Sequence, residues 1–360
     1  MSFRFFGFAN FKKQVNFLVK SKGFRYGAIL ILVILLGIKL SASHSIYIPK
    51  SSFFDFISHK NLRVILVSPF GKFGEQQAHR YMCSSLKKLG YSPICVYSDV
   101  LIHVISHLMD IDVCISSEQK MFCPENSYNC LIVHWRSKQI KKRYDAILSI
   151  IPEDQVREIC PEGLIIPFFF SVPATKFSDN PKERLFFGGC IWDKYRKSVV
   201  RKLYEFLDNT NYFDLYGVKN LGISSYKGCI PFGENTVLKI MEKSGITLVL
   251  HSGEHFENNI PTARIFEAAA ASTVVITDRL PFIVKNFGDS VLYIDRDKSP
   301  EEIFRQIDAH MQWILSHPQE AIELARRSHE IFLQNFTLEQ IMKKVMDGYK
   351  NSKEKSNSIR

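Results

Sequence analysis

The sequence predicts an α/β protein built from two Rossmann-like domains, each a parallel sheet covered by helices on both faces. Apolar runs typical of strands that are buried on both faces alternate along the chain with segments of helical pattern. The clearest unit lies between residues 246 and 277, where two apolar runs flank a segment of good helix formers. At 360 residues, the chain is long enough for two domains that each have their own core.

The apolar runs fall into two groups, separated by a proline-containing change of domain at 152–183. Strands of the first domain are predicted at 62–68, 92–97, 112–116, 130–134 and 146–151. Strands of the second domain are predicted at 184–187, 213–216, 246–250, 274–277 and 291–294. Strands that alternate with helices predict a parallel sheet in each domain.

The unit at 246–277 predicts a binding site at the carboxyl edge of the second sheet. A polar loop follows the first strand, and Pro261 leads into a helix at 262–271. The strands of such a unit are parallel, and ligands of open α/β sheets bind at the edge where these strands end. Arg264 and Glu267 are three residues apart, so they project from one face of this helix.

Arg264 and Glu267 have the chemistry of a nucleotide site. An arginine near a helix N-terminus suits a phosphate, and a carboxylate one turn later can accept hydrogen bonds from both ribose hydroxyls. The alternative is that the two residues pair with each other on the helix surface. Such a pair would stabilise the helix by only about 0.2–0.5 kcal/mol.

Three segments of the second domain resemble the donor-binding half of GT-B glycosyltransferases. They are RIFEAAAAS at 264–272, VVITD at 274–278 and FGDSVLYID at 287–295. The resemblance is to the family-one/family-four type, including the CgeB-like branch, and it covers 184–336 well and the first domain only in outline. It implies a GT-B fold, in which two Rossmann-like domains face each other across a cleft and the last helix returns to the first domain.

The resemblance also implies roles for residues of the predicted helix. Glu267 would bind the nucleotide ribose, and Arg264 would contact the diphosphate and offset its charge as the glycosidic bond breaks. Asn259 stands where relatives carry a second glutamate, and Ser272 stands where a glycine is common. These departures keep the nucleotide site and bear on the identity of the sugar.

The start of the second domain offers a further diphosphate site. Gly188 and Gly189 follow the strand at 184–187, and Lys194 and Arg196 lie at the start of the next helix. Glycines allow a ligand to approach the backbone, and basic residues at a helix start suit a diphosphate. A solvated helix start is the alternative.

The first domain contributes Gly71, Gly74 and His134 as candidates. The two glycines follow the first strand, where similar families place a loop beside the donor diphosphate and the acceptor; a plain tight turn is the alternative. His134 ends the strand at 130–134, and similar retaining enzymes carry a histidine near the donor sugar. We therefore predict a catalytic role for His134, with a hydrated or capping histidine as the alternative.

No metal site and no cofactor are predicted, because the nucleotide-sugar is the donor substrate. Asp295-Arg296-Asp297 and Asp110-Ile111-Asp112 spell D-x-D, the metal motif of the other glycosyltransferase fold. Patterns this short arise by chance, and basic residues and helix ends already provide for the diphosphate.

The net charge of +11 does not indicate nucleic-acid binding. Residues 1–39 carry +7 and residues 350–360 carry +3, which leaves +1 for residues 40–349. Nucleic-acid-binding proteins concentrate positive charge on the folded domain, so nucleic acid is not expected as a partner. The eight cysteines show no C-x-x-C pair and no metal spacing, and several read as buried thiols.

The N-terminus predicts a membrane anchor. Residues 1–25 are basic and aromatic, and the uncharged residues 26–38, extended to 42, form a short signal anchor. The positive flank places the N-terminus in the cytosol, a single-pass topology that suits a Golgi-type enzyme. In a bacterium the segment would instead lie in the membrane surface. A cleaved signal peptide and a buried N-terminal helix are the alternatives.

The sequence thus predicts a membrane-anchored, metal-independent glycosyltransferase that moves a sugar from a nucleotide-sugar donor to a glycan, lipid or protein acceptor. A fucosyltransferase-like member of the fold, a nucleotide-sugar epimerase and an inactive scaffold are the alternatives. The expected parts are a basic segment (1–25), an anchor (26–42), a stem (43–60), the first domain (61–170), a linker (171–183), the second domain (184–335), and a return helix with a polar tail (336–360).

A chain shortened to begin at Ser43 should fold and be soluble, because it lacks the apolar segment that we assign to the membrane. The full-length chain should need detergent. Fractionation of both proteins checks this, and the anchor is wrong if the full-length chain is soluble without detergent or the shortened chain aggregates.

Overall fold

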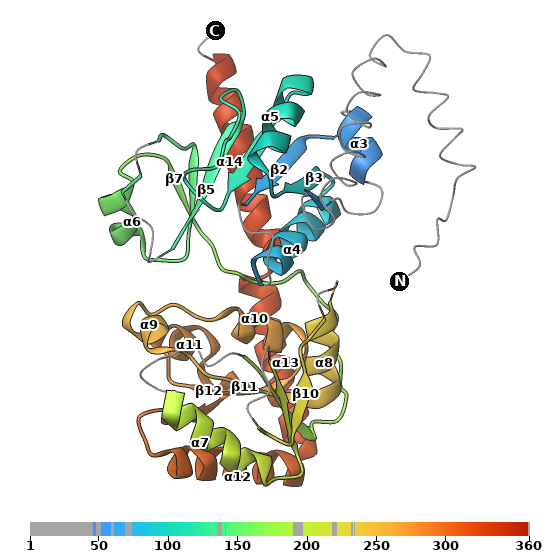
Figure 1. Ribbon diagram of the computed structural model, residues 1–360, viewed down its shortest axis with the longest axis vertical. Coiled ribbons are helices and arrows are strands. Elements are labelled where there is room, and N and C mark those ends of the chain that lie inside the picture. Colours follow the sequence, from blue (N-terminus) through green and yellow to red (C-terminus); the bar gives the residue numbers. More distant parts are fainter. Residues whose placement is uncertain are drawn as a thin grey trace, which may run out of the picture.

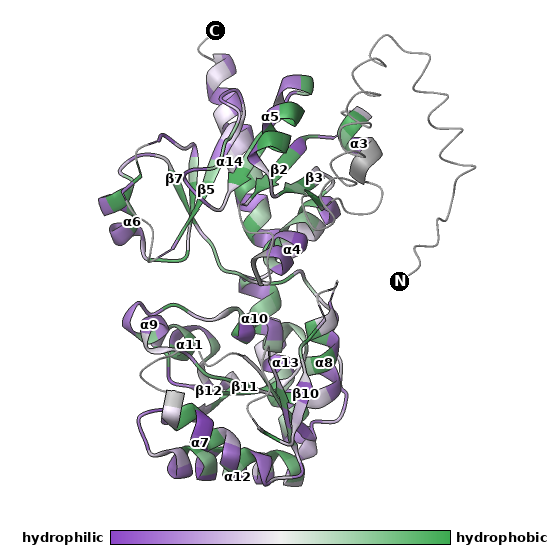
Figure 2. Ribbon diagram, in the orientation of Figure 1, coloured by the Kyte–Doolittle hydropathy of each residue, from purple (hydrophilic) through white to green (hydrophobic). Residues whose placement is uncertain are grey.

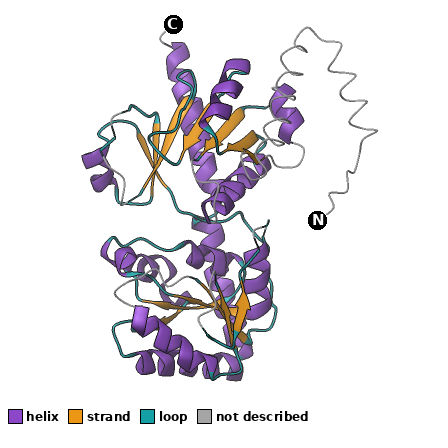
Figure 3. Cartoon of the chain, viewed as in Figure 1, coloured by secondary structure: helices purple, strands orange, loops and turns teal. Residues whose placement is uncertain are grey.

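A computed structural model describes residues 46–47, 52–58, 61–68, 74–134, 139–140, 142–189, 197–217, 222–231, 233 and 235–358. In these ranges the strands form two sheets, each flanked by helices. The two sheets belong to separate domains (Figures 1 and 3). The anchor predicted at 26–42 lies outside the described residues. Within them, no helix is long and apolar enough to span a membrane.

The first sheet has the strand order β1-β3-β2-β4-β5-β6-β7, and all its neighbours pair in parallel except β1 with β3. Its strands are β1 (Ile46–Tyr47), β2 (Arg63–Val67), β3 (Ser92–Val96), β4 (Val113–Ser116), β5 (Tyr128–Val133), β6 (Ala146–Ser149) and β7 (Leu164–Pro167). The apolar runs predicted as strands between 62 and 151 each overlap one of them. The parallel sheet predicted for the first domain is therefore confirmed.

Alternation along β2 shows why this sheet is covered on both faces. Val64 and Leu66 pack in the core beneath α4 (Gly74–Lys88) and α14 (Leu338–Ser358). Ile65 and Val67 pack in a second core beneath α3 (Ser52–Ser58) and α5 (Asp99–Leu108). Successive side chains of a strand point to opposite faces, so an apolar run without alternation is buried from both sides. The remaining helix, α6 (Glu153–Ile159), precedes β7.

The stem predicted at 43–60 is in part a piece of the first domain, which corrects that assignment. β1 adds an antiparallel strand to β3, and Phe56 of α3 is only 3% exposed. The side-chain Nε of Arg63 donates to the Phe56 carbonyl at 2.6 Å. The segment contains too few residues to show a strand period, so its pairing depends on a partner that the local sequence does not reveal.

The second sheet has the strand order β10-β9-β8-β11-β12-β13 and is parallel throughout. Its strands are β8 (Arg184–Gly188), β9 (Phe213–Tyr216), β10 (Tyr226–Gly228), β11 (Gly245–Val249), β12 (Val274–Asp278) and β13 (Leu292–Ile294). The strands predicted for this domain are confirmed. The order reverses between β8 and β11, because the chain builds outward from β8 in one direction and from β11 in the other. Ligands of such sheets bind at the carboxyl edge of this reversal.

Two layers of helices cover the second sheet. One core lies under α7 (Lys197–Asp208) and α12 (Pro300–Ser316). The other face carries α8 (Thr236–Ser244), α10 (Ala263–Ala270), α11 (Pro281–Phe287) and α13 (Pro318–Asn335). A short helix, α9 (Gly253–Glu257), lies in the loop between β11 and α10. Figure 2 shows the apolar residues gathered on the strands and on the helix faces that meet them.

The last helix, α14, leaves the second domain and packs against α4 and β7 of the first (Figure 1). The Tyr349 hydroxyl donates to the Asp112 carboxylate at 3.2 Å, and the Leu338 amide donates to the Val172 carbonyl at 3.1 Å. The polar tail expected at the end of the chain is helical as far as Ser358. Its lysines and glutamate are good helix formers, so a solvated extension of a packed helix is stable there.

Ser171→Ala should destabilise the junction between the domains. The buried Ser171 hydroxyl donates to the Phe336 carbonyl at 2.5 Å, and its loss leaves that carbonyl unpaired. We expect a loss of about 1–3 kcal/mol in the free energy of unfolding, measured by denaturant titration. Ser316→Ala is the matched control, because the exposed Ser316 hydroxyl donates to the Gln312 carbonyl within one helix. Equal losses in the two variants would contradict the role of Ser171.

Candidate functional site

The helix α10 begins at the carboxyl edge of β11 and lies on the side of the second domain that faces the first (Figure 1). Thr262 is its N-cap, in extended backbone conformation. Ile265, Phe266 and Ala268 are buried, which fixes the helix on the sheet. Arg264 and Glu267 are left on the opposite face, as their spacing predicts.

Arg264 and Glu267 form an ion pair through Arg264 Nη1 and Glu267 Oε2. The Arg264 side chain is 30% exposed and that of Glu267 is 11% exposed, so the pair is more buried than one on a helix surface. Arg264 Nε also donates to the Gly188 carbonyl at the end of β8, at 3.0 Å. The pairing raised as an alternative is present, but the pair is also bonded to the end of β8, beside the reversal of the sheet.

The turn after β8 is shaped by three glycines. A Cβ at Gly188 would lie 2.6 Å from the Phe186 ring and 3.6 Å from Arg264 Cζ. A Cβ at Gly217, after β9, would lie 2.6 Å from the Gly189 carbonyl oxygen. A side chain at Gly188 would clash with the Phe186 ring, and one at Gly217 would clash with the Gly189 backbone, so the glycines let this turn close beside Arg264.

Tyr81 brings the first domain to this site. It lies on α4 and is 4% exposed. Burial raises the pKa of its hydroxyl, the Glu267 carboxylate raises that pKa further, and Arg264 lowers it. Tyr81 also shares a core with Ile265 and Phe266 of α10, so the helix that carries the ion pair lies where the two domains meet.

Polar residues at the ends of β11, β12 and β13 form a second cluster at the same edge. His251 Nδ1 lies 2.6 Å from Asp278 Oδ1, and the His251 amide donates to Asp278 Oδ2 at 2.9 Å. Arg296 Nη1 donates to the His251 carbonyl at 3.3 Å. Residues at the ends of neighbouring parallel strands, or two positions beyond them, thus bind one another.

Comparison with known proteins identifies the fold. Residues 196–347 match the family model described as glycosyl transferase-like. A glycosyltransferase structure from Rickettsia africae aligns with 81% of the chain and 98% of its own length, at 12% identity and a TM-score of 0.52. The second domain is therefore glycosyl transferase-like, and the chain has the GT-B fold.

Other solved structures share the fold of this enzyme. HepE from Anabaena, solved with UDP and with UDP-glucose, aligns over 81% of the chain and its own full length, with a TM-score of 0.50 and an identity of 10% or 11%. TarM is longer: the match covers 72% of the enzyme and 59% of TarM, at 10% identity and a TM-score of 0.46. No curated protein matched the sequence. At these identities the structural matches establish the fold.

Of the residues predicted for the nucleotide-sugar, the structure brings Arg264, Glu267 and Gly188 together, with Gly189 beside them. Gly74 begins α4, and His134 follows β5 in the first sheet. These two stay predictions, since no described contact joins them to the ion pair. Gly71, Lys194 and Arg196 lie outside the described residues.

Asn259 is bound to the start of α11. Its backbone has a φ of 51°, a conformation that asparagine tolerates, and its side-chain Oδ1 accepts from the Phe282 amide at 2.7 Å. The side chain therefore fastens the loop to the start of α11. Ser272 has a φ of 57°, which explains why glycine suits this position. A nucleotide contact of Asn259 stays a prediction.

The contacts of His251, Asp278 and Arg296 with one another were not predicted from the sequence. The available signal was a polar residue within two positions after each of three apolar runs, since parallel strands end at a common edge. Tyr81 gave no such signal, because its helix belongs to the other domain.

The D-x-D motif at 295–297 is engaged within its own turn. Asp295 Oδ1 accepts from the Asp297 amide at 3.1 Å, and Asp295 Oδ2 lies 3.8 Å from Lys298 Nζ. Across the described ranges, no group of histidine, cysteine and acidic residues could hold a metal ion.

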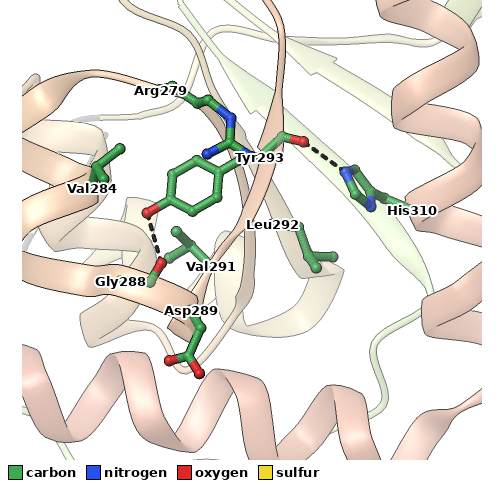
Figure 4. A pocket seen from close by; sticks show the side chains of 8 residues that line it. All are labelled: Arg279, Val284, Gly288, Asp289, Val291, Leu292, Tyr293 and His310. Carbon is green, nitrogen blue, oxygen red and sulfur yellow. Dashed lines mark hydrogen bonds between the residues drawn. The ribbon is translucent and has the colours of Figure 1, made fainter.

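A cavity of about 490 Å³ lies at the outer edge of the second sheet, beside β13 (Figure 4). The Arg279 guanidinium stacks 4.6 Å from the centre of the Tyr293 ring, and His310 Nε2 lies 2.9 Å from the Tyr293 carbonyl. None of the residues predicted for the donor lines this cavity, and its polar groups bind one another. The ion pair at the sheet reversal is therefore the better candidate site.

Proposed function

We propose that this protein transfers a sugar from a nucleotide-sugar donor to a glycan, lipid or protein acceptor. The donor would occupy the carboxyl edge of the second sheet between β8 and β11, and the acceptor would approach from the first domain. The observation that carries the proposal is the partly buried Arg264–Glu267 pair, which is bonded to the Gly188 carbonyl at this edge. The CgeB-like branch is part of the proposal.

The ion pair is suited to exchange partners when the donor binds. Without a ligand, each side chain neutralises the other in a partly buried place. A diphosphate would offer Arg264 a second anion, and a ribose would offer Glu267 two hydroxyl donors. The buried charges would then keep partners, so binding would not leave either of them unpaired.

Arg264 would act mainly on the transition state. Negative charge grows on the diphosphate as the bond to the sugar breaks, and a fixed guanidinium stabilises the charge as it develops. Gly188 holds the arginine at Nε, so its orientation is set before the donor arrives. The basic residues Lys194 and Arg196 would add positive charge to the same turn.

The complexes of HepE with UDP and with UDP-glucose support a nucleotide-sugar as the donor here. The proposal also includes a reaction without a metal ion, a catalytic role for His134, and attachment to a membrane through 26–42.

Glu267→Gln should weaken donor binding about ten- to a hundredfold. The variant keeps its shape but loses a charge-assisted hydrogen bond, which contributes about 1.5–3 kcal/mol. Arg264→Ala should lower kcat more than donor affinity, because the charge that it offsets grows during the reaction. Steady-state kinetics measure both, and a thermal-shift screen of nucleotides selects the donor.

Glu323→Gln is the matched control, because Glu323 forms an exposed pair with Arg326 at the same spacing of three residues. It should leave donor kinetics unchanged. If Glu267→Gln behaves like this control, the Arg264–Glu267 pair only stabilises a helix. Replacing the donor with its 2′-deoxyribose analogue should weaken binding to the wild type more than binding to Glu267→Gln. Equal losses of affinity in the two proteins would contradict a ribose contact of Glu267.

Removal of divalent metal by EDTA should leave transfer largely intact. We expect the diphosphate charge to be offset by Arg264 and by the basic turn after β8 rather than by a cation. Activity before and after chelation tests this. Loss of activity that Mg²⁺ or Mn²⁺ restores would contradict it.

A further inference from the structure

Three neighbouring strand ends are joined by one buried network. Its members are His251 after β11, Asp278 at the end of β12 and Arg296 after β13, defined here as the strand-end network. The side chains of His251 and Asp278 are 0% exposed, and that of Arg296 is 11% exposed. The register explains the contact: Val249 pairs with Thr277 and Asp278 pairs with Ile294, so the residues that follow are neighbours.

Asp278 holds His251 at two points. One carboxylate oxygen accepts the backbone amide at 2.9 Å, and the other lies 2.6 Å from ring atom Nδ1. A buried carboxylate needs such donors, and the short contact assigns the Nδ1 proton to this hydrogen bond. Both the backbone and the ring of His251 are therefore fixed.

Arg296 extends the network to α9. Its guanidinium lies 3.8 Å from the centre of the Phe256 ring, and its Nη1 donates to the His251 carbonyl. The His251 ring lies beneath the same helix, with its centre 6.2 Å from that of Phe256. A planar guanidinium can stack and donate at once, which a lysine ammonium cannot do.

The loop at 251–261 is thus held along its length. Asp278 fixes its start, Arg296 fixes its middle at Phe256, and Asn259 fixes its end on the Phe282 amide. The loop leads directly into α10, which carries Arg264 and Glu267. Helices α9, α10 and α11 lie along one side of the second domain (Figure 1).

The network also has a feature that stability alone does not explain. His251 Nε2 is buried and has no hydrogen-bond partner within the part of the chain that the structure describes. A buried unpaired nitrogen costs free energy, and an apolar residue would avoid this cost. The hydrogen bonds of its other nitrogen and of its backbone offset this cost.

We propose that His251, Asp278 and Arg296 are positioning residues of the transfer reaction. They hold the loop at 251–261 and, through it, the start of α10, so that Arg264 meets the donor in the reactive orientation. This inference rests on the proposed function. A positioning role predicts an effect on turnover that exceeds the effect on nucleotide affinity.

Asp278→Asn and Arg296→Lys test the proposal, with Asp289→Asn as the control. Asp289 lies in the same domain, and its side chain is 92% exposed in an ion pair with Arg327. We expect both test variants to lower kcat at least tenfold while the Kd for UDP or GDP, whichever the wild type binds, changes less than threefold. Amide hydrogen exchange at 251–261 should become at least tenfold faster. The control should match the wild type in all three measurements.

The outcomes separate this inference from the proposed function. Unchanged kcat and unchanged amide hydrogen exchange in both test variants would overturn the positioning role. Equal losses in kcat and nucleotide affinity without faster exchange would also overturn it. A wild type that neither binds a nucleotide nor transfers a sugar would instead overturn the proposed function and, with it, the positioning role. If Asp278→Asn does not fold, Arg296→Lys decides, because it retains the charge and loses the stacking and the fork of donors.

Discussion

The parallel pairing of β8 with β11 is the constraint on which the candidate site depends. Gly245 pairs with Arg184 and Thr247 with Phe186, so the two strands end side by side at one edge. The strand order reverses between β8 and β11, the place where ligands of open parallel sheets bind. Arg264 donates to the Gly188 carbonyl at the end of β8. The same geometry aligns the ends of β12 and β13, and thus brings Asp278 and Arg296 to His251.

The charged residues at this edge form pairs, and the pairs differ in whether a ligand could replace one partner. Asp278 is fully buried and bound to one residue through both oxygens, so no ligand can reach it without unfolding the loop. Glu267 is bound to Arg264 within one helix turn and keeps some exposure to solvent. The first pair is therefore suited to fix the backbone, and the second to exchange partners with a ligand.

Local pattern was enough to predict most of the strands, though not β1, β7 or β10, and the shared face of Arg264 and Glu267. Apolar runs such as that of β2 are read directly from the sequence, and a spacing of three residues places side chains together on any helix. The contact between His251 and Asp278 was beyond this reasoning, because it joins residues 27 positions apart and depends on the register of β11 against β12. The orientation of Asn259 depends on a positive φ and on where α11 begins. Neither is encoded in residue type alone.

The path of α14 has a consequence for how the protein is made. The first domain contains residues from both ends of the chain, since Ile341, Met342 and Val345 share a core with Val64 and Leu66. Its sheet is synthesised early, but one of its faces is covered in part by α4 and is completed only by the 21-residue helix α14, which follows the second domain in the chain. On the ribosome, part of that apolar face therefore stays uncovered until the second domain has emerged. Completion of the first domain follows synthesis of the second, and it joins the two domains as it occurs.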